Sequence, residues 1–174
     1  QHRGEIDMLE ETYLKIISSK TSSLFSAATK VGAILADREL KYKDALEFYG
    51  KNLGLTFQIA DDTLDYNSEL KVFGKKIGND FFEGKVTLPV ILLYQKVSDK
   101  DKSIIKSFFE KDERKIEELN YVLDLIKKNN IIRDCYKKAE HFINLASNSL
   151  SVFVDSEEKE ILKNLTTFTI ERNF

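Results

Sequence analysis

Several residue types are scarce in this chain of 174 residues. It has one proline, seven glycines, one cysteine and no tryptophan. So little proline and glycine leaves few turns for an all-β domain, while leucine, isoleucine, alanine, lysine and glutamate recur at helical spacing. A lone cysteine, Cys135, excludes an internal disulfide and a CxxC metal or redox motif. We therefore predict an all-α fold in a single domain over residues 1–174.

The chain also lacks a dominant charge and a long apolar run. Its 27 Lys and Arg against 29 Asp and Glu leave a net charge of -2, so no global field indicates nucleic acid or an anionic membrane. No run reaches the ~18 uninterrupted apolar residues of a membrane span, and the first residues contain no signal-peptide core. We expect a soluble, intracellular protein, with cytoplasm, mitochondrion and plastid equally open. Because the chain does not begin with methionine, we expect part of the protein to precede Gln1.

Apolar spacing and capping signals place the helices. An apolar stripe from about Leu9 to Leu35 predicts one long buried helix, and a second helix is expected from about Lys41 to Tyr66. Residues 67–85 contain three glycines among lysines and are typical of a loop. Pro89 favours a helix beginning near Thr87 or Leu88. Capping signals predict further helices after Ser98, Asp112, Asn130 and Asp155.

The stretch FQIADDTLD, residues 57–65, crowds three aspartates at the end of the second helix. At about 100° per residue, one helical face holds Phe57, Gln58, Asp61, Asp62 and Asp65. Like charges four residues apart, and anions near a helix C-terminus, are unfavourable, so something should compensate them. Mg²⁺ is the natural candidate, because it takes carboxylate oxygens and completes its shell with water and phosphate. A solvated acidic helix end is the alternative interpretation.

Two other features favour an anion-binding site. Gly50 and Gly54 share the aspartate face and would admit a neighbouring helix or a ligand. Lys20 lies inside the apolar stripe, where a buried ammonium needs an anionic partner, although it could also extend out to solvent or pair with a core acid. Thr21 beside it could donate to a phosphate oxygen.

The glycine-rich loop adds further cations. Lys75 and Lys85, with Asp80, lie among its glycines, and flexible lysines with exposed backbone amides suit a polyphosphate. An ordinary mobile basic loop is the alternative. The GxxxxGK[ST] pattern of a P-loop fails here, because Val86 follows Lys85. Carboxylates for a metal together with lysines for anions indicate a metal-bridged diphosphate.

Three ordered motifs now resemble one family. LGLTFQIADDTLDY, residues 53–66, resembles the second aspartate-rich region, GxxFQxxDDxxD, of the trans-prenyl diphosphate synthases, or polyprenyl synthetases. GKKIGNDFFEGKVTLP, residues 74–89, resembles the GKxxGxDxxxGKxTLP segment that follows it, in a form most like the long-chain enzymes. Lys20 and Thr21 resemble the preceding KT motif. The resemblance implies an isoprenoid-synthase-type bundle of antiparallel helices around a central cavity, usually homodimeric.

The resemblance also implies a reaction and residue roles. Isopentenyl diphosphate would be condensed with an allylic prenyl diphosphate, with Mg²⁺ bridging the allylic diphosphate to aspartates. Asp61 would bind Mg²⁺ most directly, with Asp62 and Asp65 assisting directly or through water. The allylic diphosphate would be held by Lys20, Lys75 and Lys85. The catalytic residues would be Lys20, Thr21 and Gln58, of which Thr21 and Gln58 would lie near the reacting carbons. Phe57 would line the cavity.

One departure from the family pattern leaves other interpretations open. Members carry a first DDxxD upstream, and none occurs here besides residues 61–65, so we expect this chain to be the C-terminal half and to be inactive alone. A non-catalytic or regulatory subunit, in a heteromer with another synthase subunit, is the main alternative. A class I terpene cyclase is disfavoured because Glu83 stands where its metal motif needs Ser or Thr. A plain helical interaction module would leave Lys20 and the aspartates unexplained.

Overall fold

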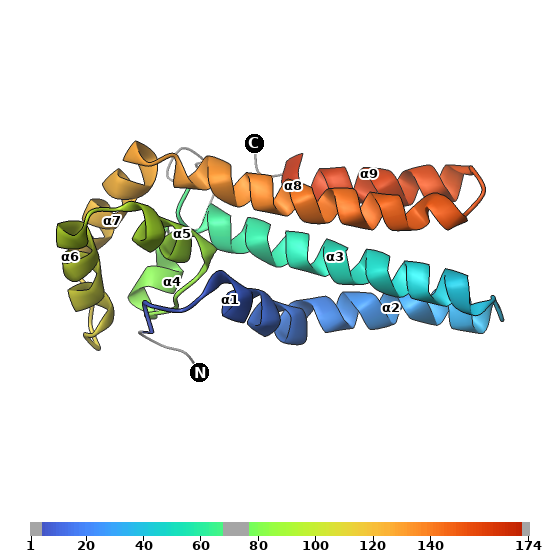
Figure 1. Cartoon of the computed structure of the whole chain (residues 1–174), viewed down its shortest axis with the longest axis horizontal. Helices are drawn as coiled ribbons and strands as arrows, with labels where there is room; N and C mark the ends of the chain where they lie inside the picture. Colours follow the sequence, from blue (N-terminus) through green and yellow to red (C-terminus); the bar gives the residue numbers. More distant parts are fainter. Residues whose placement is uncertain (1–4, 68–76, 172–174) are drawn as a thin grey trace. The chain divides into compact units, whose positions relative to one another are not determined.

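The computed structural model describes residues 5–67 and 77–171, and these residues form helices and no β-strand (Figure 1). The all-α prediction is therefore confirmed. The chain divides into two compact units, Gln1–Tyr13 with Asp61–Tyr136 (unit 1) and Leu14–Ala60 with Lys137–Phe174 (unit 2). The single domain over residues 1–174 stays a prediction.

One helical run occupies the first predicted helix. It comprises α1 (Glu10–Ile17), a π-helical turn η1 (Ser18–Ser22) and α2 (Ser23–Leu35). The next helix, α3 (Leu40–Leu64), agrees with the predicted 41–66. The remaining elements are α4 (Asn79–Phe82), α5 (Leu88–Lys96), α6 (Asp99–Phe109), α7 (Ile116–Lys128), α8 (Ile131–Ser149), the 3-10 turn η2 (Leu150–Val152) and α9 (Glu157–Glu171).

Unit 2 is built around α3, with α2, α8 and α9 running alongside it (Figure 1). Tyr49 and Leu53 of α3 form a buried apolar cluster with Ala146 and Leu150. The Tyr49 hydroxyl donates a hydrogen bond of 2.8 Å to the carbonyl of Leu162, which ties α3 to α9. Burying this apolar surface is the main source of stability for the unit.

The predicted buried stripe is wrong for α2. Leu24, Val31 and Leu35 are 72%, 46% and 82% exposed. The face of α2 that meets α3 is partly polar instead: the hydroxyls of Ser26 and Thr29 donate to α3 carbonyls at 3.1 and 2.6 Å. The π-helical turn contributes to this difference, because one extra residue in a helix rotates every following side chain by about 100°.

Unit 1 packs its short helices through aromatic and capping contacts. Phe81 of α4 is fully buried and meets the Phe109 ring of α6 edge-on at 5.5 Å. The predicted start of α5 near Thr87 or Leu88 is confirmed, because α5 begins at Leu88. The predicted cap at Ser98 is also confirmed, since its side chain accepts from the amide of Asp101. Within residues 5–67 and 77–171, no helix combines the length and apolarity needed to cross a membrane.

The helix predicted after Asp112 begins later than expected. Lys115 is the residue that precedes α7, and Glu118 accepts a hydrogen bond of 3.0 Å from the Lys115 amide. This local bond, from the third helical residue back to the cap, satisfies an amide at the helix start. The start of α7 is therefore set by Glu118 rather than by Asp112.

Candidate active site

The π-helical turn carries Lys20 and Thr21 in unit 2. The Thr21 hydroxyl donates a hydrogen bond of 2.7 Å to the Oε1 atom of Gln58 on α3. The structure thus brings together two of the residues predicted to act near the reacting carbons. Lys20 is exposed rather than buried, so its ammonium does not depend on a core acid. π-turns inside α-helices are frequently found at functional sites.

Gly50 and Gly54 allow this turn and α2 to approach α3. A Cβ atom on Gly54 would lie 2.6 Å from the Cα atom of Ser22, and one on Gly50 would lie 2.4 Å from the carbonyl oxygen of Phe25. Both clashes are with backbone, which cannot rotate away. Gly50 and Gly54 were predicted to admit either a neighbouring helix or a ligand, and the structure shows that a helix packs against them. Phe57 is half-buried, with its ring centroid 5.6 Å from that of Phe25, and its role in lining a cavity stays a prediction.

The three aspartates at the end of α3 belong to unit 1 and have different surroundings. Asp61 is half-buried, whereas Asp62 and Asp65 are only 6% and 5% exposed. The Tyr13 hydroxyl of α1 donates a 2.7 Å hydrogen bond to Oδ2 of Asp62. A buried carboxylate requires such donors, because it has lost the hydrogen bonds that water would provide.

Asp65 follows the last residue of α3 and binds the start of α4. Its Oδ1 accepts from the amide of Asn79 at 3.2 Å, and its Oδ2 from the amide of Asp80 at 2.8 Å. Its carbonyl accepts from the amide of Gly78 at 2.8 Å. Gly78 has a φ of 83°, in the left-handed region that glycine adopts without strain. Asp65 therefore fixes the turn through which the chain enters α4.

The carboxylates give this part of unit 1 a negative field. The pKa of Tyr13 is raised well above its ordinary value by burial and then by the charge of Asp62. Burial, followed by the charges of Asp80 and Asp65, raises the pKa of Tyr66 in the same direction. Both hydroxyls therefore stay protonated at neutral pH and can act only as uncharged donors or acceptors.

Hard carboxylate oxygens suit a divalent cation such as Mg²⁺ or Ca²⁺. In the part of the chain that the structure describes, no three His, Cys, Asp or Glu side chains are grouped so as to hold a metal ion. Mg²⁺ is usually bound by one or two carboxylates, with water and substrate phosphate completing its shell. The half-buried Asp61 and its neighbour Asp62 fit that requirement by their chemistry.

The structure describes two of the three lysines predicted to bind the diphosphate, Lys20 and Lys85. The Lys85 ammonium pairs with Glu83 at 2.7 Å and with Asp80 at 3.2 Å, and the hydrogen bond to Glu83 is the main cause that raises its pKa. The side chain is 44% exposed, so its ion pairs are accessible to a competing anion. Lys75 lies outside the described residues.

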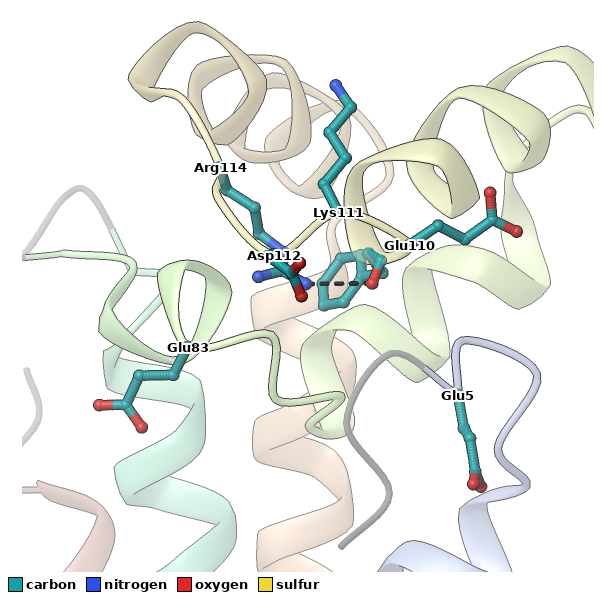
Figure 2. Close-up of a pocket in the computed structure, with 7 residues that line it drawn as sticks. Glu5, Glu83, Glu110, Lys111, Asp112 and Arg114 are labelled. Atoms are coloured by element: carbon teal, nitrogen blue, oxygen red, sulfur yellow. Dashed lines mark hydrogen bonds between the residues drawn. The ribbon is translucent and has the colours of Figure 1, made fainter.

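A pocket of about 350 Å³ lies elsewhere in unit 1 (Figure 2). None of the predicted site residues that the structure describes lines it; its walls are formed by Glu5, Glu83, Phe109, Glu110, Lys111, Asp112 and Arg114. Arg114 donates to the carbonyls of Phe82 and Phe109 at 3.3 and 3.0 Å. A Cβ atom on Gly84 would lie 2.5 Å from its guanidinium. Arg114 therefore supports the turn that precedes Lys85, a role that its position in the sequence did not indicate.

Comparison with known proteins assigns the chain to a family. The model of the polyprenyl synthetase family matches residues 1–126. A short chain isoprenyl diphosphate synthase of Methanothermobacter thermautotrophicus is 34% identical over 167 residues, which cover 96% of this chain and 51% of that protein. An all-trans-nonaprenyl-diphosphate synthase of Rhodobacter capsulatus is 33% identical over 172 residues, or 99% of this chain and 52% of that protein.

The fold agrees with this relationship. A crystal structure of a polyprenyl synthase from Caulobacter crescentus, complexed with calcium and isoprenyl diphosphate, matches with a TM-score of 0.93 and 30% identity. The match covers 100% of this chain and 53% of that one, so the chain spans about half the length of its relatives. Its helices have the isoprenoid-synthase-type all-α fold of these enzymes, and the chain belongs to the polyprenyl synthetase family.

Proposed function

We propose that the protein to which this chain belongs is a prenyltransferase that condenses isopentenyl diphosphate with an allylic prenyl diphosphate. The observation that carries the proposal is the aspartate-rich end of α3, in a chain of the polyprenyl synthetase family. There a half-buried Asp61 precedes two buried carboxylates, of Asp62 and Asp65, that accept hydrogen bonds from protein donors. The form of residues 74–89 favours a long-chain polyprenyl product, and a homodimer is the proposed assembly.

In the proposed reaction the bond between the allylic carbon and the diphosphate oxygen breaks, and pyrophosphate leaves with the electron pair. The isopentenyl double bond forms the new carbon–carbon bond, and loss of one proton restores a double bond. A bound Mg²⁺ would neutralise the charge that develops on the leaving diphosphate. Asp61 would hold that ion most directly, with Asp62 and Asp65 supporting it.

The chain's other polar groups would bind and orient the substrate. The ammonium groups of Lys20, Lys75 and Lys85 would bind diphosphate oxygens, which favours departure of the leaving group. Lys85 would exchange its ion pair with Glu83 for the substrate, because that pair is exposed to solvent. The Thr21–Gln58 pair would present a fixed dipole near the developing positive charge and take part in the loss of the proton.

The test is a calorimetric titration of Mg²⁺ and a bisphosphonate, used as a diphosphate mimic, into wild type and Asp61→Ala. We expect Asp61→Ala to weaken Mg²⁺-dependent binding by at least about tenfold, because even indirect partners of a metal contribute that much. Asp124→Ala is the matched control, since Asp124 is an exposed aspartate on α7. Equal binding by wild type and Asp61→Ala would show that the aspartate motif does not hold the metal. In the protein of natural length, incorporation of labelled isopentenyl diphosphate should fail with the same substitution.

A further inference from the structure

Tyr13 reaches the aspartate motif from a distant part of the sequence. It lies on α1, 49 residues before Asp62, and its hydroxyl donates to Oδ2 of that carboxylate at 2.7 Å. The two residues are 2% and 6% exposed, so water does not compete freely for the bond. A hydroxyl that donates to a buried carboxylate forms one of the stronger hydrogen bonds in proteins, because the acceptor is charged.

The two buried aspartates of the motif are held in different ways. Asp65 binds two backbone amides, which are set by the entry into α4 and do not depend on a side chain. Asp62 instead accepts from a side-chain hydroxyl, which a single substitution can remove. Fixing Oδ2 restricts rotation of the carboxylate and therefore sets the direction of its second oxygen, Oδ1.

We propose that Tyr13 is a positioning residue of the metal-binding motif, which holds the Asp62 carboxylate in the orientation that binds a divalent cation together with a diphosphate. This inference rests on the proposed function, since it requires the motif to bind a cation. Partners that orient the ligands of a metal commonly contribute ten- to a hundredfold to metal affinity, although they do not touch the metal. Tyr13 would therefore act on the reaction through Asp62.

The competing explanation is that Tyr13 only satisfies a buried carboxylate and thereby stabilises the fold. Both explanations predict a loss of stability when the hydroxyl is removed, because a buried hydrogen bond is lost. They differ in metal binding. A purely structural role would lower the melting temperature and leave the affinity of the folded protein for Mg²⁺ unchanged.

Tyr13→Phe removes the hydroxyl and keeps the ring, so it is the variant to test in the full chain. Tyr49→Phe is matched for burial, because Tyr49 is fully buried and donates to the carbonyl of Leu162 in unit 2. Tyr121→Phe is matched for chemistry, because Tyr121 donates at 2.7 Å to Asp101, a carboxylate away from the motif. Calorimetry would measure the affinity for Mg²⁺ at a fixed bisphosphonate concentration. A second titration, of bisphosphonate in EDTA, would measure how tightly the protein binds bisphosphonate without a metal.

We expect Tyr13→Phe to weaken Mg²⁺ binding about tenfold and to leave metal-free binding unchanged. Tyr49→Phe and Tyr121→Phe should bind Mg²⁺ as wild type does. Wild-type Mg²⁺ affinity in folded Tyr13→Phe would overturn this inference and leave the proposed function standing, whatever its melting temperature. The inference would also be wrong if all three variants weakened Mg²⁺ binding equally. Failure of wild type itself to bind Mg²⁺ with the bisphosphonate would refute the proposed function, and this inference with it.

Discussion

Substituting Gly54 by alanine tests how the π-helical turn is held against α3. The added Cβ would lie 2.6 Å from the Cα atom of Ser22 and 3.2 Å from the Cβ atoms of Ser22 and Phe25. Ordinary carbon contacts begin near ~3.5 Å, so the turn and α3 must separate by roughly 1 Å. Because the nearest atom is backbone, no side-chain rotation relieves this clash.

The change in the free energy of unfolding caused by Gly54→Ala follows from two opposing contributions. Overpacking of this kind costs about 1–3 kcal/mol, and the severity of a backbone clash places Gly54→Ala near the upper limit. Alanine gains about 1 kcal/mol over glycine inside a helix. The net loss is then about 2 kcal/mol, which corresponds to a fall of roughly 4–8 °C in Tm for a chain of this size.

Thermal unfolding followed by circular dichroism at 222 nm measures this effect. Gly32→Ala is the matched control, because Gly32 also lies in a helix of unit 2 and a Cβ there would meet nothing within 4 Å. Its Tm should rise by a few degrees, since only the helical gain of about 1 kcal/mol remains. If Gly54→Ala also raised Tm, the close contact between the turn and α3 would be refuted.

Two further predictions concern unit 1. Asp65→Ala should destabilise the protein by about 2 kcal/mol, because the amides of Asn79 and Asp80 lose a charged acceptor. Urea unfolding would measure this loss, with Asp124→Ala as the exposed control. Equal stability of the two variants would contradict the role of Asp65 at the start of α4. Burial raises the pKa of the Cys135 thiol to about 12, from an ordinary value of 9.0, so iodoacetamide at pH 8 should modify it only on unfolding. The thiol has a higher pKa in the folded protein than in the unfolded chain, so raising the pH favours unfolding. The stability linked to its protonated form is complete below pH 9 and is lost as pH rises toward 12. Rapid alkylation of the native protein would show that the thiol is accessible.

Local signals in the sequence predicted the helices and the end of α3. Pro89 and Ser98 act within one helical turn, so their effects were visible without the fold. The exposed face of α2 was missed because a uniform helical period cannot include the extra residue of the π-helical turn. Tyr13 falls within the apolar stripe from Leu9 to Leu35, and nothing near it in the sequence indicates a carboxylate 49 residues away.

For the site residues too, local patterns predict positions within one helix but not contacts between distant parts of the sequence. Helical periodicity predicts that Gln58, Asp61 and Asp62 lie on α3, since these positions depend only on spacing, and Asp65 follows the last residue of that helix. The pairing of Thr21 with Gln58 depends on two glycines that bring separate helices together. The bonds from Asp65 to α4 join residues 14 and 15 positions apart in the sequence, a pairing that no local pattern specifies.

Metal removal separates two explanations for the crowded charge at the end of α3. From the sequence alone, three aspartates near a helix C-terminus need some compensation, for which a cation is the natural candidate and solvent the alternative. In the structure, Asp65 follows the last residue of α3 and its charge is compensated by two amides of α4, while Asp62 accepts from Tyr13. Under the proposed function, a cation would then serve in binding diphosphate and would not be needed for folding.

We therefore expect EDTA to change Tm by less than about 2 °C, because a weakly held ion contributes only the small binding free energy that its concentration allows. Tm measured in EDTA and in Mg²⁺ alone should nearly coincide, and the bisphosphonate should raise Tm only when Mg²⁺ is present. A structural metal would behave differently, since its binding free energy is folding free energy and its removal unfolds the protein. A large loss of Tm in EDTA would mean that the hydrogen bonds of Asp62 and Asp65 are insufficient to hold this end of α3.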